Sequence, residues 1–267
     1  MSGGQYAARE AAAAHCFVER LDDAIAIDGP DGHHLQRVRR LRTGELVTAA
    51  DGLGGWRRYV ITAAEPGRLV LRAESGVTIE PEPAPAVCVA VALTKGTKLE
   101  TVVAQLTELG VSRIEPVRAR RSVVRWDAAR AEAAVARLRA VAREASMQCR
   151  RARIPVVAPV CELADLTGRP GIVVASLDGG PASGLPKPVV GAWPLGAWTV
   201  LVGPEGGFEP GETEALGPIG HLALSPYVLR AQTAPVVAAA LLVARGLDES
   251  GVTSDATITE SESPREA

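Results

Sequence analysis

The chain has few cysteines and histidines, the residues from which disulfide frameworks and zinc sites are built, and it has no long apolar run. Its four cysteines lie far apart with no Cys-x-x-Cys pair, and its four histidines share no helical i,i+4 spacing. No apolar stretch approaches the ~20 residues that cross a bilayer, and the alanine-rich start lacks the features of a signal peptide. We therefore expect reduced thiols, no metal, no membrane partner and a soluble protein of the cytoplasm.

The glycine motifs that bind nucleotide phosphates are also missing. The sequence contains neither Gly-x-x-x-x-Gly-Lys-Ser/Thr nor Gly-x-Gly-x-x-Gly. The glycine-rich run at 51–55 has no helical pattern after it, so we interpret it as a hairpin turn. A nucleotide-binding oxidoreductase is therefore disfavoured.

The net charge of −2 conceals an uneven distribution of charge. Residues 248–267 carry a net charge of −5, which leaves +3 on residues 1–247. Residues 113–153 hold twelve arginines and four acids, and residues 33–60 hold six arginines and two acids. Such basic segments suit contacts with nucleic-acid phosphates, although arginine-rich exposed faces are also common in proteins without that role.

Residues 15–80 are predicted to form a small β-barrel. Short β-like runs alternate there with turn-forming clusters of Gly, Pro and Asp. The one helical candidate, at 33–41, carries three arginines. Residues 1–14 are expected to be flexible, and the repeated prolines of residues 81–86 predict an extended linker to a second domain.

Residues 87–247 are predicted to form an α/β domain with a parallel sheet, because apolar strands alternate with helical patterns. Asp127 is the expected N-cap of a long helix, and Pro235 falls in the first turn of the last one. The acidic tail, residues 248–267, has few large apolar residues and is expected to be disordered.

Two loops in this domain follow predicted strands and precede helical patterns. They are residues 203–208 (GPEGGF) and residues 224–234 (LSPYVLRAQTA). The carboxyl ends of parallel strands meet at one edge of a sheet, so we expect both loops to form a ligand site there. The glycines allow close approach of the backbone, and Glu205 would repel an anion. The alternative for the first loop is a plain turn before a helix that begins near Pro210.

The order and the sequences of the two loops resemble those of the SPOUT class of RNA methyltransferases and, within it, of the family that methylates N3 of a uridine in 16S ribosomal RNA. Further motifs that look like this family are HLQRVRRLRTG (34–44), KGTKLETVVAQLTELG (95–110), Arg121-Ser122 and EASMQCRRARIP (144–155). The resemblance implies S-adenosylmethionine as cofactor, the small ribosomal subunit as substrate and a homodimer. It also implies a SPOUT domain with a C-terminal trefoil knot, preceded by a PUA-like barrel that helps to hold RNA.

The resemblance also implies roles for individual residues. Arg230 is the expected catalytic side chain, because a cation near O2 or O4 would stabilise the anion that forms when N3 of uridine loses its proton. Its alternative role is a phosphate clamp or a salt bridge at the start of the last helix; no residue is assigned as general base. The expected cofactor-binding residues are Leu177, Val202, Gly203, Pro204, Glu205, Gly206, Gly207, Leu224, Ser225, Pro226, Val228, Leu229, Arg230 and Thr233. The expected RNA-binding residues are Arg37, Arg39, Arg40, Arg120, Arg121, Arg125, Arg150, Arg151 and Arg153.

Three residues depart from the family pattern: Gln232 stands where the family usually has glutamate, Ser225 where it has glycine, and Gln105 where it has lysine. Gln232 keeps a hydrogen-bonding side chain but loses a charge. Two alternatives stay open, a SPOUT methyltransferase with another RNA target and a non-catalytic RNA-binding or ribosome-assembly protein. The retained glycines of the first loop and Arg230 argue against the second.

Overall fold

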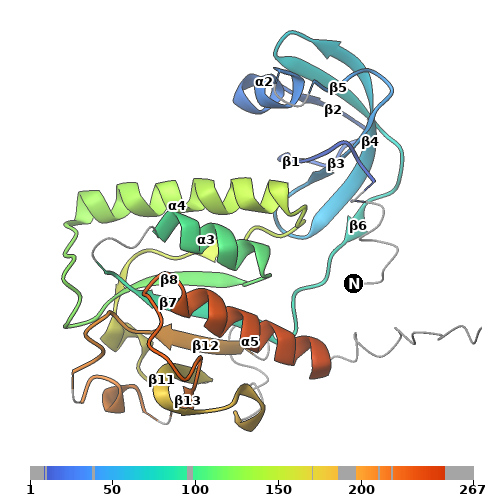
Figure 1. Cartoon of the computed structure of the whole chain (residues 1–267). Coiled ribbons are helices and arrows are strands. Elements are labelled where there is room, and N and C mark those ends of the chain that lie inside the picture. The colour runs from blue at the N-terminus through green and yellow to red at the C-terminus, as the bar shows by residue number, and fades with distance from the viewer. Residues whose placement is uncertain are drawn as a thin grey trace, which may run out of the picture.

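Two β-sheets, each with its own helical cover, make up the chain (Figure 1). The computed structural model describes residues 9, 11–37, 40–94, 99–169, 171–185, 197–209, 211–217 and 219–249. The first sheet is built from the N-terminal part of the sequence and ends with β6 (Thr78–Ile79), and the second begins with β7 (Ala86–Ala92). Within these ranges, no helix has the length and hydropathy needed to span a membrane.

The N-terminal sheet has six strands in the order β1-β3-β4-β5-β2, with β6 paired to β4. Its other strands are β1 (Ala14–Phe17), β2 (Ala24–Ile27), β3 (Leu46–Ala50), β4 (Gly55–Glu65) and β5 (Arg68–Ala73). β1 pairs with β3 in parallel, and the other pairs are antiparallel. Alternating residues such as Val47, Tyr59 and Leu71 pack into one core, because the pleat directs them to the same face.

Two expectations for the N-terminal part differ from the structure. Helix α2 spans Gly29–Arg37 and so begins before the predicted 33–41; Pro30 lies in its first turn, where a missing N–H removes no helical hydrogen bond. Part of the segment expected to be flexible is packed, because Arg9 and Ala12 are buried and the Arg9 guanidinium pairs with Glu80. Residues 1–8 and the tail from 250 onward lie outside the described residues.

The second sheet is parallel throughout and has the order β10-β8-β7-β12-β11-β13, with β9 paired to β8. Its further strands are β8 (Arg113–Arg118), β9 (Val156–Val157), β10 (Cys161–Glu162), β11 (Ile172–Gly180), β12 (Ala197–Val202) and β13 (Gly220–Leu222). The central strands β7 and β12 are buried at every residue, as expected of strands covered on both faces. The predicted α/β domain with a parallel sheet is confirmed.

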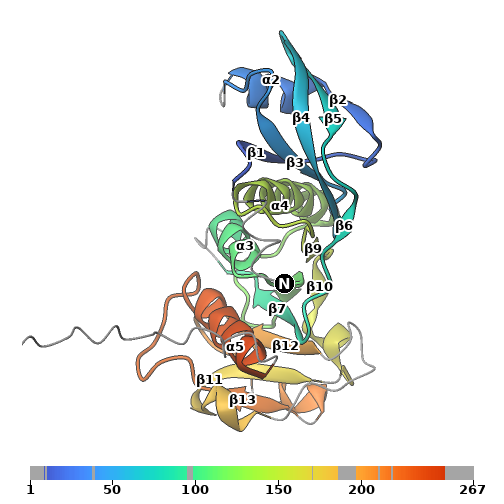
Figure 2. The ribbon, with the colours of Figure 1, turned by 90° about the vertical axis from the view of Figure 1, so that its right-hand side faces the viewer.

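Three helices pack on this sheet, namely α3 (Leu99–Glu108), α4 (Ala128–Gln148) and α5 (Ala234–Glu249). α3 packs against α4 and α5, and α5 lies on β7 and β12. Asp127 caps α4 as predicted, because its carboxylate accepts a hydrogen bond from the backbone N–H of Arg130 at 2.8 Å. α4 also contacts β1, so this helix lies between the two sheets (Figure 2).

The helix expected to begin near Pro210 is not formed by the described residues. Residues 211–213 form turns, and one 3-10 turn, η3 (Glu214–Leu216), follows. Gly211 and Gly217 have φ angles of 84° and 93°, which an α-helix does not contain. Short 3-10 turns also occur at η1 (Leu163–Leu166) and η2 (Ala182–Gly184).

Candidate functional site

The two loops singled out by their sequence leave the same edge of the parallel sheet. β11 lies between β12 and β13 and is parallel to both, with Val174 opposite Leu201 on one side and Ala175 opposite Leu222 on the other. Residues 203–208 follow β12, and residues 224–234 follow β13. The prediction that both loops meet at one sheet edge is therefore confirmed.

A cavity of about 250 Å³ lies between these loops; we call it the loop cavity. It is walled by the end of β11, the loop after β12 and the loop after β13. Its lining residues are Ala175, Ser176, Leu177, Val202, Gly203, Pro204, Glu205, Gly207, Phe208, Leu224, Ser225, Tyr227, Val228, Leu229, Ala231 and Ala234. Glu205 is the one charged residue in this set, and the set contains no cation.

The expected cofactor-binding residues divide into two groups. Ten of them line the loop cavity, namely Leu177, Val202, Gly203, Pro204, Glu205, Gly207, Leu224, Ser225, Val228 and Leu229. Gly206, Pro226, Arg230 and Thr233 do not line it. The sequence placed only Leu177 of β11 in the site and missed Ala175 and Ser176, which precede it on the same strand. It also passed over Phe208 and Tyr227, although both lie inside the two loops.

The first loop turns sharply at positions where only glycine fits. A Cβ on Gly203 would lie 2.9 Å from the Phe208 ring, closer than carbon atoms pack. Gly207 has a φ angle of 68°, and its N–H donates to the Pro204 carbonyl at 2.8 Å. Glycine therefore allows the chain to fold back so that the Phe208 ring packs beside Gly203 at the cavity wall.

The second loop is shaped by hydrogen bonds that lead into α5. The Ser225 hydroxyl accepts a hydrogen bond from the Tyr227 N–H at 3.0 Å, and the Arg230 carbonyl accepts from the N–H groups of Thr233 and Ala234 at 2.8 and 3.0 Å. The Arg230 side chain is exposed. Within the described part of the chain no ion pair or hydrogen bond engages its guanidinium, so the alternative of a salt bridge at the start of α5 finds no support there.

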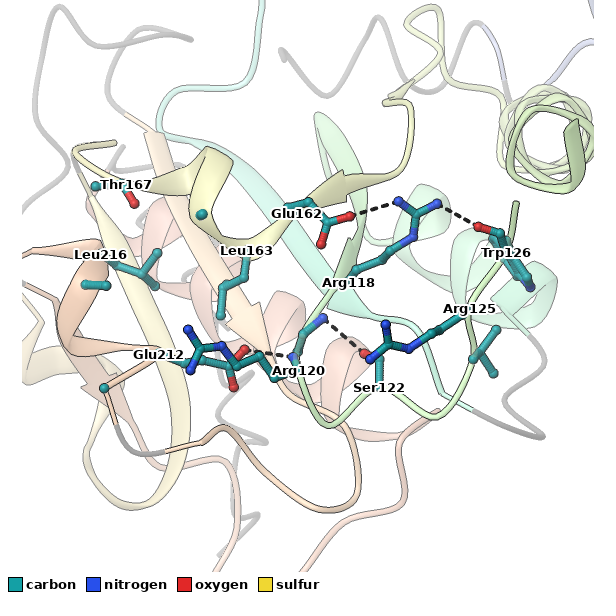
Figure 3. A pocket seen from close by; sticks show the side chains of 15 residues that line it. Arg118, Arg120, Ser122, Arg125, Trp126, Glu162, Leu163, Thr167, Glu212 and Leu216 are labelled. Carbon is teal, nitrogen blue, oxygen red and sulfur yellow. Dashed lines mark hydrogen bonds and ion pairs between the residues drawn. The ribbon is translucent and has the colours of Figure 1, made fainter. Parts of the chain in front are cut away.

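A second hollow, of about 500 Å³, opens at the carboxyl ends of β8 and β10 (Figure 3). We call it the arginine hollow. Its lining residues are Arg118, Ala119, Arg120, Ser122, Val124, Arg125, Trp126, Glu162, Leu163, Ala164, Thr167, Gly211, Glu212, Ala215 and Leu216. Two of the arginines expected to bind RNA, Arg120 and Arg125, are among them.

Hydrogen bonds connect the segments that line the two hollows. The Glu212 carboxylate accepts hydrogen bonds from the backbone N–H groups of Arg120 and Glu209, at 2.8 and 2.7 Å. The Arg121 guanidinium donates to the Gly206 carbonyl at 2.8 Å. Residues 205, 207 and 208 thus line the loop cavity, and residues 211 and 212 line the arginine hollow. The loop that follows β8 holds this stretch through Gly206 and Glu212.

Three other arginines expected to bind RNA lie where α4 meets the N-terminal sheet. Arg151 donates to the Thr107 carbonyl at 2.6 Å, and burial lowers its pKa. Arg150 donates to carbonyls of the N-terminal segment, and Arg153 donates to the Glu80 carbonyl at 3.0 Å. The guanidinium groups of Arg150 and Arg153 thus join the second domain to the N-terminal segment and the linker, whereas that of Arg151 holds the end of α3. The sequence did not indicate these roles.

The remaining expected RNA contacts belong to the segment around α2. Arg40 is exposed and has a φ angle of 54°. Arg37 ends α2, but its side chain lies outside the described part, as does Arg39. Their predicted role stays a prediction.

The cysteines offer no activated nucleophile. Burial raises the pKa of Cys16 and Cys88 to about 12 and that of Cys161 to about 11, so these thiols stay protonated near neutral pH. Within the described ranges, no three His, Cys, Asp or Glu side chains gather in a way that would hold a metal ion.

The sequence matches two families of known protein domains. Residues 80–243 match the family described as RNA methyltransferase domain, and residues 27–74 match the RNA methyltransferase PUA domain. A protein of Mycobacterium tuberculosis named Ribosomal RNA small subunit methyltransferase E is 37% identical over 233 residues, which are 83% of this chain and 88% of the relative. The chain belongs to the RNA methyltransferase family. A Bacillus subtilis protein of the same name is 29% identical over 232 residues, covering 82% of this chain and 90% of that protein.

Solved structures show the same fold for this member of the RNA methyltransferase family. The Neisseria gonorrhoeae Ribosomal RNA small subunit methyltransferase E, solved bound to S-adenosyl methionine, has a TM-score of 0.73 at 25% identity, over 85% of this chain and 95% of that one. A Legionella pneumophila protein, solved with the cofactor SAM, has a TM-score of 0.74 at 22% identity, over 86% and 97% of the two chains. The parallel-sheet SPOUT domain preceded by a PUA-like domain is thus confirmed. The trefoil knot stays a prediction, because strand order alone does not fix how the C-terminal segment is threaded.

Proposed function

We propose that this protein uses S-adenosylmethionine to methylate N3 of a uridine in the 16S ribosomal RNA of the small ribosomal subunit, in the cytoplasm. The observation that carries the proposal is the loop cavity, which the two glycine- and arginine-bearing loops form at one sheet edge. Membership of the RNA methyltransferase family and relatives named for the small ribosomal subunit support the choice of substrate.

The lining of the loop cavity fits S-adenosylmethionine better than a phosphate-bearing ligand. Val202, Leu224 and Leu229 offer apolar walls to an adenine ring, and glycine backbone in the first loop leaves peptide groups accessible for hydrogen bonds. Among the residues that the structure describes, the lining has one carboxylate, on Glu205, and no cation. A sulfonium is compatible with that charge, whereas a phosphate would be repelled.

Gln232, which stands where the family usually has glutamate, does not line the loop cavity. Its side chain is exposed and does not border the loop cavity. A glutamine in place of the family's glutamate therefore leaves the walls of the cavity as they are. Ser225 does line the cavity, and its hydroxyl accepts the Tyr227 N–H, which gives this departure a part in shaping the loop.

S-adenosylmethionine, when bound, supplies the methyl group on its sulfonium. The task of the protein is then to bring the uridine to that methyl group and to favour loss of the N3 proton. Arg230 is exposed beside the cavity, between lining residues Leu229 and Ala231. Its guanidinium would stabilise the negative charge that spreads from N3 onto O2 and O4. The general base is left unassigned; hydroxide or another base from the solvent would suffice to take the proton.

A homodimer would complete this site. Leu177, Tyr227 and Val228 line the cavity, yet 62%, 78% and 83% of their surfaces are exposed. Large apolar side chains gathered at the mouth of a cavity favour contact with another protein surface. We propose that a second copy of the chain covers them and closes the site.

Isothermal titration with S-adenosylmethionine tests the cofactor. Wild type is expected to bind one equivalent per chain. Ala231→Trp, which places a large ring at the cavity wall, should abolish binding, whereas Ala244→Trp on the exposed side of α5 should not. A folded wild type that does not bind the cofactor would favour the non-catalytic RNA-binding alternative.

The reaction is tested by incubating small ribosomal subunits that lack the modification with enzyme and cofactor, then digesting the RNA and identifying methylated nucleosides by mass spectrometry. N3-methyluridine in 16S RNA is the expected product. A methyl group on another nucleoside, or in another RNA, would overturn the assigned position and favour a different RNA target.

A further inference from the structure

The arginine hollow is separate from the loop cavity. It lies at the carboxyl ends of β8 and β10, whereas the loop cavity lies at those of β11, β12 and β13, and the two share no lining residue. Its volume of about 500 Å³ is the larger of the two and falls in the range of sites that enclose a small molecule.

The lining combines an apolar floor with a cationic rim. Leu163 of η1 and Leu216 of η3 are buried, belong to one core cluster and border the hollow, and Trp126 lies at the other end of it (Figure 3). Arg120 and Arg125 are exposed at the rim. A flat apolar ring that carries an anionic group is complementary to such a surface, because aromatic side chains stack on nucleobases and guanidinium groups pair with phosphate.

The two carboxylates of the hollow are already engaged. Glu162 accepts a hydrogen bond from Arg118 at 2.9 Å, and Glu212 accepts the backbone N–H groups of Arg120 and Glu209. Their negative charge is therefore offset by protein donors and is less repulsive to a phosphate than free carboxylates would be.

The rim arginines, by contrast, are weakly held. The Arg120 side chain is 69% exposed and approaches Glu209 at 3.4 Å. In the described part of the chain, the Arg125 guanidinium makes no hydrogen bond or ion pair. Both groups thus keep donors for an incoming anion, whereas Arg118 is fixed by Glu162 and by the Trp126 carbonyl, the latter at 2.9 Å.

We propose that the arginine hollow binds one nucleotide of the substrate RNA other than the methylated uridine, with its base on the apolar floor and its phosphate on Arg120 and Arg125. This inference rests on the proposed function, because it takes an RNA strand as the substrate. The site would hold the strand while the target base lies at the loop cavity, because hydrogen bonds from the loop after β8 to Gly206 and Glu212 connect the walls of the two hollows.

Binding of a 16S RNA transcript to protein saturated with S-adenosylhomocysteine, measured by filter retention, tests the site. Arg125→Glu reverses a charge at the rim, and Ala215→Trp fills the hollow from an exposed position. Each variant is expected to raise the Kd for RNA about tenfold. The matched controls are Arg130→Glu and Ala136→Trp, at exposed positions of α4 outside the hollow, and they should change it less than twofold. Arg125→Ala should also lower the salt slope of binding by about one.

Four outcomes would overturn the proposal. Wild-type affinity for RNA in Arg125→Glu and Ala215→Trp, with cofactor binding intact, would exclude the arginine hollow but leave the proposed function standing. Equal losses in the controls would indicate general electrostatics instead of a site. Binding of free uridine or guanosine monophosphate can be followed by Trp126 fluorescence, with Trp126→Phe as the reference. If such a nucleotide saturates the hollow while RNA binding is unchanged in both variants, the hollow binds a free nucleotide and not the RNA strand. A wild type that binds the cofactor but no RNA would remove the proposed function as well.

Discussion

The Arg121 guanidinium donates a hydrogen bond to the Gly206 carbonyl at 2.8 Å, and this contact joins two segments 85 residues apart in the sequence. Arg121 belongs to the loop after β8, and Gly206 belongs to the glycine loop after β12. A short loop rich in glycine is thereby held by a charged side chain that follows β8, a strand separated from β12 by β7. The position of the glycine loop, which walls the loop cavity, depends on this contact.

Arg121→Ala is therefore expected to weaken cofactor binding. The variant removes a charge-assisted hydrogen bond and frees the glycine loop, so the Kd for S-adenosylmethionine should rise on the order of three- to tenfold in isothermal titration. Arg125→Ala is the matched control, because Arg125 is exposed in the same loop and its guanidinium makes no hydrogen bond or ion pair within the described part of the chain. Equal cofactor affinity in wild type and Arg121→Ala would show that the contact does not position the loop.

Arg230→Ala is expected to lower turnover rather than cofactor affinity. If the guanidinium stabilises the uridine anion, the single-turnover rate with saturating RNA and cofactor should fall on the order of a hundredfold, as when one oxyanion donor is removed. The Kd for S-adenosylmethionine should change little, since Arg230 does not line the loop cavity. Arg230→Lys, which keeps the charge but loses the planar fork, should recover part of the rate. A normal rate in Arg230→Ala would leave only the role of a phosphate clamp.

His15 links the stability of the domain junction to pH. Its ring is buried, with Nδ1 2.8 Å from the Thr48 hydroxyl and Nε2 donating to the Arg151 carbonyl at 3.0 Å. Burial, together with the charges of Arg9 and Arg150, lowers the His15 pKa from 6.5 to about 4, although the Arg151 carbonyl opposes this shift. The folded state therefore holds the neutral ring, whereas the unfolded chain takes up a proton below pH 6.5.

Stability is thus expected to fall as the pH drops from 6.5 toward 4, with no further loss from this group below that range. Linkage gives a loss of about 2 kcal/mol at pH 5 relative to pH 7. Urea unfolding of wild type and His15→Gln at both pH values measures it, because glutamine keeps a hydrogen-bond donor but does not titrate. Between pH 7 and pH 5, the free energy of unfolding of His15→Gln should fall by about 2 kcal/mol less than that of wild type. Identical losses in the two proteins would contradict the prediction.

The sequence predicted the strands and the glycine loop of the loop cavity, but it did not predict which distant segments lie beside one another. The apolar runs that became β7 and β12, and the glycine loop, are local patterns that can be found without knowing the fold. By contrast, Arg118, Glu162 and Leu216 meet in the arginine hollow although they come from three separate segments. Only the strand order brings the ends of β8 and β10 beside residues 211–216, and no local pattern specifies that order.

The arginines illustrate the same limit. Arg125 and Arg151 look alike in the sequence, since both lie in the basic segment at 113–153. Arg125 is exposed, whereas Arg151 is turned inward to the carbonyls of Thr107 and Val111. Charge alone predicts a cationic surface, whereas the carbonyls of Thr107 and Val111, near the end of α3, accept the guanidinium that turns away from that surface.

Val228→Lys is expected to separate the proposed dimer. Val228 is 83% exposed at the mouth of the loop cavity, so a lysine there costs the single chain little but would place an unpaired charge in an apolar interface. Light scattering after size exclusion should show a dimer for wild type and a monomer for this variant, whereas Ile79→Lys, at a position that is 63% exposed on the N-terminal sheet, should stay dimeric. Because the partner chain would close the site, the methylation rate per chain of Val228→Lys should rise with protein concentration while that of wild type stays constant. A monomeric wild type, or a monomeric variant with full activity, would show that one chain forms the complete site.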